Sequence, residues 1–173
     1  MGQNTESSAS GMRPYRSPYG HFPVRNYPEA AASTFHAGNL VTPSTVGSTA
    51  SHKVALMSSL SSDILGVAAS AASGTDGDLV PVYEARPEIE FKGWIKEVIA
   101  SSLVWNDRSV AYDSTQGIHY LAVNATADEQ RVVITEVGPS AGGPEQQLAG
   151  IGDTNGYVAF RVIPDFSIYG KST

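Results

Sequence analysis

The stretch from residue 63 to residue 91 constrains the fold most, because it combines two apolar segments with a turn between them. The turn, residues 74–78, reads Gly-Thr-Asp-Gly-Asp, in which glycine tolerates positive φ and short carboxylates can cap backbone amides. Residues 64–72 are almost all small or apolar, which indicates a strand covered on both faces. Residues 88–91 alternate between polar and apolar side chains, as in a strand with one buried face. This stretch therefore predicts the centre of a compact β domain.

Turn signals recur along the rest of the chain and separate short apolar runs. The runs predicted to be strands are residues 53–57, 109–112, 118–123, 131–137 and 157–163. The most β-branched run is 131–137, and we expect Val133 at its centre to be buried. Residues 92–99 suit either a short helix or a continuing strand. Short strands at regular spacing predict a mainly β fold, with a single small β-barrel or β-sandwich domain over residues 36–173.

Residues 1–35 have a different composition and no sustained hydrophobic period. Four prolines restrict the backbone, so neither a helix nor a central strand is expected. Aromatic and arginine side chains on an extended backbone are suited to lie across another surface. The residues expected to make this contact are Tyr15, Arg16, Tyr19, Phe22, Arg25 and Tyr27. We favour an extended N-terminal arm that is mobile in isolation and binds another molecule; the alternative is an arm folded back over an edge of its own domain.

Charge and composition narrow the class of protein. The sequence has no cysteine, so disulfides and thiolate metal sites are excluded, which fits synthesis in a reducing cytoplasm. The net charge is −6, with +1 in residues 1–40 and −7 in the remainder, which argues against a nucleic-acid partner. The polar first ten residues predict no signal peptide, and the longest apolar run is too short to cross a membrane.

Catalytic and metal-binding patterns are weak. The four histidines, which include His119, have no ligand spacing, so neither a metal site nor a cofactor is expected. Residues 138–142 read Gly-Pro-Ser-Ala-Gly and match the nucleophile motif G-x-S-x-G. A helix must start directly after such a serine, and the acid and histidine must follow it, yet every histidine precedes it. The motif therefore predicts a loop, and no catalytic residue is expected.

Two further polar features have simple structural interpretations. Glu88 and Glu90 could share one strand face and act as an acid/base pair, but exposed carboxylates at a sheet edge are the commoner arrangement. His119 lies between Ile118 and Tyr120 and is interpreted as a strand residue that faces polar surroundings.

Three motifs follow one another along the chain. Residues 37–41 read Ala-Gly-Asn-Leu-Val, residues 65–69 read Leu-Gly-Val-Ala-Ala, and residues 77–83 read Gly-Asp-Leu-Val-Pro-Val-Tyr. Together with residues 117–120 and 152–160, the order of these motifs resembles the small cement, or head-decoration, proteins of tailed bacteriophages. The resemblance implies a β-barrel or β-tulip core without enzymatic activity. It also implies a protein made in the host cytoplasm that binds the outer surface of the virion, where its partner is the major capsid protein.

One alternative of another class remains from the sequence. A stand-alone β-barrel enzyme or carbohydrate-binding module could use Trp94, Trp105 and Tyr120 as stacking platforms. The proline- and tyrosine-rich leader favours the capsid protein, because an arm adds buried area to an interface without a larger domain. Association with itself, as a dimer or trimer, is a further expectation.

Overall fold

The computed structural model describes residues 11–44, 52–57, 63–122, 130–138 and 148–170. These residues form a mainly β structure, which confirms the predicted fold class. In chain order the strands are β1 (Arg13–Arg16), β2 (Val24–Pro28), β3 (Thr34–Phe35), β4 (Leu40–Pro43), β5 (Val54–Leu56), β6 (Gly66–Ala68), β7 (Ala72–Ser73), β8 (Leu79–Glu84), β9 (Glu90–Ile95), β10 (Asp107–Asp113), β11 (Ile118–Ala122), β12 (Val132–Glu136) and β13 (Gly156–Val162). Two short 3-10 turns accompany them, η1 (Ser101–Leu103) and η3 (Pro164–Phe166).

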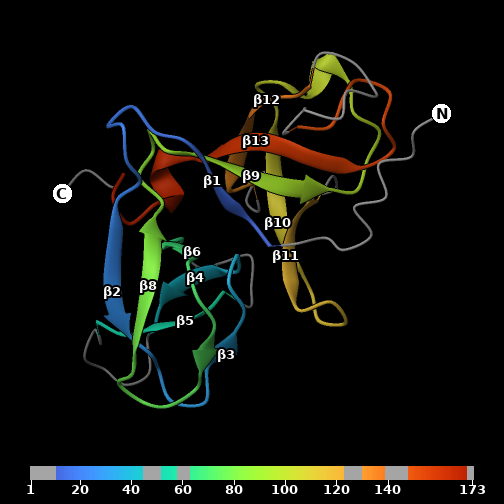
Figure 1. Cartoon of the computed structure of the whole chain (residues 1–173). Helices are drawn as coiled ribbons and strands as arrows, with labels where there is room; N and C mark the ends of the chain where they lie inside the picture. Colours follow the sequence, from blue (N-terminus) through green and yellow to red (C-terminus); the bar gives the residue numbers. More distant parts are fainter. Residues whose placement is uncertain (1–10, 45–51, 58–62, 123–129, 139–147, 171–173) are drawn as a thin grey trace.

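Five strands close into a small barrel in the order β9-β11-β10-β12-β13, because β13 also pairs with β9 (Figure 1). Neighbouring strands are antiparallel except β9 and β11, which pair in parallel where Leu121 lies opposite Ile95. Alternate side chains point into the barrel, and the rings of Phe91 and Phe160 pack there with their centroids 6.0 Å apart. The barrel interior is therefore filled with side chains.

A second sheet has five strands in the order β2-β8-β6-β4-β5, and β3 pairs with β7 beside it (Figure 1). One face of this sheet has its own small core, which contains Phe35, Val41 and Val82. Leu40 and Val67 from the same sheet belong to the larger core, together with the barrel residues. The sheet and the barrel consequently bury apolar surface against each other.

Two glycines of the motifs quoted above occupy positions where a side chain does not fit. A Cβ atom on Gly66 would lie 2.1 Å from the backbone oxygen of Tyr83, so the close approach of β6 to β8 requires glycine. Gly38 has a φ of +86° and accepts a hydrogen bond from the backbone N–H of Met12 at 2.8 Å. Residues 37–41 thus combine a turn, closed by the bond from Asn39 N–H to the carbonyl of His36, with an anchor for the N-terminal segment.

Residues 11–35 are strands of their own chain's sheets. β1 pairs with β9 and β2 pairs with β8, both antiparallel, and Met12 is buried in the larger core. The expectation that this segment lacks structure in isolation is therefore wrong for residues 11–35, whereas residues 1–10 lie outside the described residues. The fold corresponds to the alternative in which the segment covers sheet edges. The prolines of this segment are compatible with strands, because β1 and β2 lie at the edges of their sheets, where a missing N–H is tolerated.

The remaining strand predictions are largely confirmed. Strands occur in each of the five predicted runs, and β9 continues to Ile95, which settles the ambiguity over residues 92–99 in favour of a strand. The turn between β10 and β11 is capped by Asp113, whose Oδ1 accepts hydrogen bonds from the N–H groups of Thr115 and Gln116. The strand predicted over residues 64–72 is shorter than expected. Val133 is only half-buried, which corrects the expectation for that residue.

Candidate binding surfaces

The catalytic patterns of the sequence gain no support from the described residues. Gly138 forms a single β-bridge with Gly150, and residues 139–142 of the G-x-S-x-G motif lie outside the described part of the chain. Within that described part, no group of three or more histidine, aspartate or glutamate side chains is arranged to hold a metal ion. No helix among the same residues has the length and apolar character needed to cross a membrane.

His119 is buried, which corrects the expectation of polar surroundings. Its Nδ1 accepts a hydrogen bond from the backbone N–H of Leu40 at 3.1 Å, so the proton is on Nε2, which donates to the carbonyl of Met57 at 2.8 Å. Burial lowers the pKa of His119 to about 4, and the hydrogen bond to Met57 opposes this shift. His119 is thus a neutral structural link from the barrel to the five-stranded sheet.

Glu88 and Glu90 do not form a pair of exposed carboxylates. Glu90 is only 4% exposed, and Arg161 donates to its Oε1 at 2.8 and 3.2 Å. Arg16 adds an ion pair to Glu90 at 3.3 Å. Glu88 is half-buried and accepts a hydrogen bond from the hydroxyl of Tyr19. Each carboxylate therefore has its own partners, which favours a structural role over acid/base chemistry.

Tyr15 and Arg16 of the predicted arm lie on β1 against the barrel wall. Arg16 donates to Glu136 at 2.8 Å in addition to its ion pair with Glu90. Partial burial raises the pKa of the Tyr15 hydroxyl, and the negative charge of Glu136 raises it further. Both side chains are thus already engaged within the chain.

Tyr19 and Phe22 lie between β1 and β2. Tyr19 is 47% exposed even though its hydroxyl bonds to Glu88. The ring of Phe22 packs edge-to-face on Tyr83, with centroids 6.3 Å apart. Phe22 is therefore part of the packing of the five-stranded sheet, whereas Tyr19 keeps half of its surface available.

Tyr27 and Arg25 are neighbours on β2 but differ in availability. The hydroxyl of Tyr27 bonds to the hydroxyl of Tyr169, which in turn donates to Glu84 at 3.1 Å. Burial, followed by the bond to Tyr27, raises the pKa of Tyr169. The guanidinium of Arg25 lies 5.5 Å from the centre of the Tyr27 ring and has no ion pair among the described residues. Of the six predicted contact residues, Arg25 is thus the most available.

Within the described part of the chain, β2 pairs with β8 along one edge and no strand pairs with its other edge, a feature that the sequence did not reveal. Two backbone hydrogen bonds show which residues of β2 face β8. The N–H of Glu29 donates to the carbonyl of Asp78, and the N–H of Glu84 donates to the carbonyl of Pro23, so every second residue of β2 bonds to β8. In this alternation the N–H and C=O groups of Val24 and Asn26 point away from β8. We call Val24, Arg25 and Asn26 the β2 edge; all three residues are exposed. In Figure 1, β2 is the outer strand beside β8.

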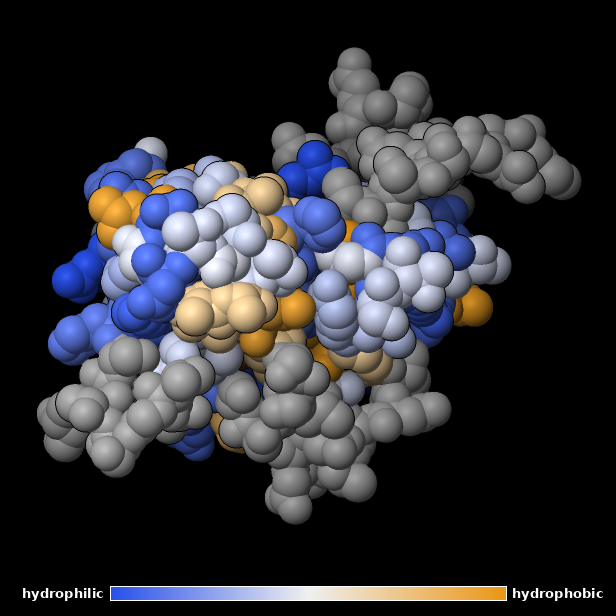
Figure 2. Space-filling view, turned by 90° about the horizontal axis from the view of Figure 1, so that it is seen from below, coloured by the Kyte–Doolittle hydropathy of each residue, from blue (hydrophilic) through white to orange (hydrophobic). Residues whose placement is uncertain are grey.

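Exposed large apolar side chains are scattered over the described surface. They are Tyr19, Val24, Leu79, Val98, Trp105 and Ile151. On the face seen in Figure 2, apolar residues form small patches between hydrophilic ones. Val24 lies on the β2 edge, Leu79 lies on β8 opposite Pro28, and Tyr19 lies in the connection between β1 and β2. These side chains do not form one large apolar face.

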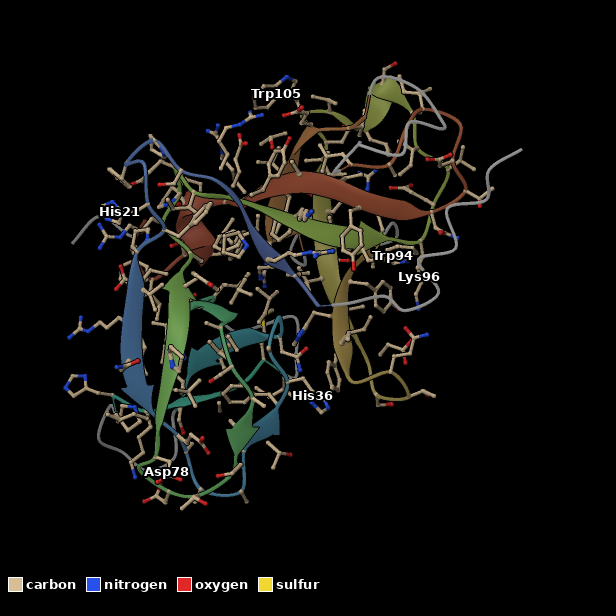
Figure 3. All side chains as sticks on the ribbon, in the orientation of Figure 1. His21, His36, Asp78, Trp94, Lys96 and Trp105 are labelled. Carbon is tan, nitrogen blue, oxygen red and sulfur yellow. The ribbon has the colours of Figure 1, made fainter. Side chains whose placement is uncertain are left out.

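The predicted stacking residues are only partly brought together. Trp94 on β9 and Tyr120 on β11 lie on neighbouring strands of the barrel, one residue before the pair Ile95 and Leu121. Trp105 is 70% exposed but lies well away from Trp94 (Figure 3). Sequence reasoning missed Tyr157, whose ring packs edge-to-face on Trp94 at 5.1 Å. The outer wall of the barrel is thus a second candidate surface.

Neither a protein-family model nor a curated protein matches this chain.

Proposed function

We propose that this protein is a non-enzymatic structural protein of a tailed-bacteriophage virion, which binds the outer surface of the capsid and stabilises contacts between major capsid subunits. The motifs that carry the resemblance support this proposal, because they coincide with turns and strands of the fold. Residues 65–69 contain β6, and residues 77–83 contain most of β8. Gly66, in residues 65–69, is required by the close approach of β6 to β8.

The observation that carries the proposal is the β2 edge, on which Arg25 has no ion pair with any described residue. An exposed strand edge binds an extended segment of a partner through main-chain hydrogen bonds. Arg25 lies on this edge without an ion pair among the described residues, so it suits a partner segment that contains a carboxylate. Pro23 and Pro28 flank the edge and limit the pairing to a few residues, which favours a specific contact over unlimited strand addition.

A second copy of the chain is less suitable as the partner at this edge. In a two-fold arrangement centred on Arg25, this residue would lie opposite its own copy, and directly opposed like charges are destabilising. The major capsid protein is therefore the proposed partner at the β2 edge. Oligomers of this protein, as a dimer or trimer, would use another surface.

The test is electron microscopy and co-sedimentation of the purified protein with capsids that lack it. We expect added density on the capsid surface and a protein that sediments with the shells. Arg25→Glu should reduce the affinity for capsids at least tenfold, which corresponds to about 1.4 kcal/mol. Arg13→Glu is the matched control, because Arg13 is also exposed and has no ion pair among the described residues but lies on the barrel wall. Wild-type protein that fails to bind the shells would contradict the proposed function.

A proline scan of β2 tests the edge itself. Asn26→Pro removes an N–H that points away from β8, so it should weaken capsid binding and leave the melting temperature nearly unchanged. Arg25→Pro removes an N–H that bonds to β8, so it should lower the melting temperature. If Asn26→Pro binds capsids as the wild type does, the contact lies elsewhere on the protein.

A further inference from the structure

Three of the six exposed large apolar side chains lie at one end of the barrel. The strand pairings place the end of β9 beside the start of β13 and, through β11, at the same end as the start of β10. Val98 follows β9, Trp105 precedes β10 and Ile151 precedes β13, and all three side chains are exposed. We call these three residues the barrel-end surface. In Figure 3, Trp105 lies at the opposite end of the molecule from Asp78, which precedes β8 of the five-stranded sheet.

Backbone hydrogen bonds hold two segments of this surface together. The N–H of Ile99 donates to the carbonyl of Asp153, and the carbonyl of Ile99 accepts from the N–H of Gly152, both at 2.8 Å. Val98 precedes Ile99 in the chain, and Ile151 precedes Gly152. The two apolar residues therefore lie on adjacent segments that are fixed to each other.

The backbone of Trp105 is in the left-handed region, with a φ of +66°, which is unfavourable for a bulky residue. Its N–H donates to the carbonyl of Ile134 at 2.8 Å, and the N–H of Asn106 donates to the carbonyl of Leu103 at 3.1 Å. The side chain is 70% exposed, so the fold gains little packing in return for this conformation. An exposed tryptophan that is rigidly held in a disfavoured conformation indicates a contact with another molecule.

The segments that carry the barrel-end surface are uncharged. Residues 98–106 and 150–152 contain no acidic or basic side chain. Glu97 and Arg108 flank the first segment and form an ion pair with each other at 2.9 Å, so their charges offset each other. Asp107 is exposed at the border of the surface. Because residues 41–173 have a net charge of −7, this neutral surface differs from the acidic average of the chain.

We propose that the barrel-end surface is the contact between two copies of this protein in a two-fold dimer. A two-fold contact places a surface against its own copy, so every charge near the axis would oppose itself. The uncharged segments avoid this repulsion, whereas the β2 edge with Arg25 does not. Trp105 of one copy packs on Val98 and Ile151 of the other copy, and the two-fold axis repeats this contact.

Charge also distinguishes a second copy from a different protein as the partner. Contacts between different proteins are commonly oriented by complementary charges, which the barrel-end surface lacks. The dimer goes beyond the proposed capsid binding and does not depend on it, because it forms between free copies in solution.

The dimer should be weak and should become stronger in salt. The contact contains few large side chains, which places it among small interfaces, so we expect a Kd on the order of 10–100 μM. Each copy has a net charge of −6, and salt screens the repulsion between the two copies. An increase in NaCl from about 50 to about 300 mM should therefore lower the Kd, whereas it would raise the Kd of a contact between opposite charges.

The test is sedimentation velocity of the full chain between about 5 and about 500 μM at both salt concentrations, which span the expected Kd. Trp105→Gly should raise the Kd of the dimer at least tenfold, because it removes the central side chain. Its melting temperature should not fall, since glycine adopts the positive φ without strain. Leu79→Ala is the matched control, because Leu79 is similarly exposed but lies on β8, and should leave the Kd unchanged.

The proposal is overturned if the wild type remains monomeric at every concentration, or if folded Trp105→Gly forms dimers as the wild type does. A sedimentation profile that fits a trimer would overturn the two-fold arrangement. A monomeric wild type whose Trp105→Gly variant is lost from capsids would assign the surface to the capsid protein instead of a second copy. Since the sedimentation experiment contains no capsids, a failure of capsid binding does not alter its outcome.

Discussion

The imidazole of His119 in the barrel accepts a hydrogen bond from the backbone N–H of Leu40 in the five-stranded sheet, across an Nδ1···N distance of 3.1 Å. The other ring nitrogen donates to the carbonyl of Met57, so the neutral ring satisfies two backbone groups of the sheet. The imidazolium form has no acceptor at Nδ1 and would lose the bond to Leu40. The hydrogen-bonded part of the link between barrel and sheet at this point therefore depends on the protonation state of His119.

The unfolding free energy should fall as the pH decreases from about 6.5 to about 4. The pKa of His119 is about 4 in the folded state, against 6.5 when the side chain is in water. The unfolded state binds the proton first in this window, so acid favours unfolding, and the contribution is complete above pH 6.5. The expected loss is about 3 kcal/mol.

Urea denaturation at pH 7 and at pH 4.5 measures this effect. His119→Gln has no titrating group, so its stability should change less between these two pH values than that of the wild type. Because the carboxylates titrate in both proteins, the difference between the two changes isolates His119. Equal changes would show that His119 does not control the pH dependence.

Gly66→Ala should destabilise the protein strongly. The added Cβ would lie 2.1 Å from the oxygen of Tyr83 and 2.6 Å from a methyl carbon of Val82, so β6 and β8 would have to separate. Overpacking of this kind costs on the order of 3 kcal/mol. Gly77→Ala is the control, because Gly77 has a φ of +89° but no atom within 4 Å of the added Cβ, and should cost only about 1–2 kcal/mol. Similar denaturation midpoints for the two variants would contradict the close approach.

Local signals predicted the strands well, since turn residues and apolar runs act over a few residues. The capped turn at Asp113 and the run of residues 131–137 are examples. Pairing between distant strands was not predictable from such signals. β1 reaches β9 across more than 70 residues, and only this pairing places Arg13 opposite Lys92. The outer wall of the barrel was therefore recognised only in part, through Trp94 and Tyr120.

Burial was harder to predict where both faces of a strand are covered. His119 lies on β11, part of which faces the five-stranded sheet instead of solvent, so its polar character gave no indication of its environment. The N-terminal segment was misjudged because prolines exclude central strands but not edge strands. Arg25 and its neighbours, expected on a mobile arm, thus lie on β2, which pairs with β8 along one edge.

The run of residues 131–137 gives a test of which face points inward. Val132 is fully buried, whereas Val133 is half-buried, because side chains alternate along β12. Val132→Ala should lower the unfolding free energy by about 2 kcal/mol through lost burial and a residual cavity. Val133→Ala should cost less than about 1 kcal/mol. The opposite order of the two denaturation midpoints would mean that the register of β12 is shifted by one residue.

The last prediction concerns Met12, which ties the N-terminal segment to the core. Met12 is 2% exposed, and its backbone N–H donates to Gly38 at 2.8 Å. Because its side chain is buried, Met12→Ala should cost about 2–4 kcal/mol of unfolding free energy, whereas the backbone hydrogen bond to Gly38 is retained. The matched control is Tyr19→Ala in the same segment, because Tyr19 is 47% exposed and should contribute far less to stability.

Thermal unfolding monitored by circular dichroism compares the two variants. Amide hydrogen exchange adds a local readout, because loss of the Met12 anchor should increase exchange in β1 and in the part of β9 that pairs with it. If Met12→Ala unfolds at the wild-type temperature with unchanged exchange in β1, residues 11–16 are not held by the core, and the segment is free to leave the domain. Binding by an arm that detaches from its own sheet would then be the better description of this part of the chain.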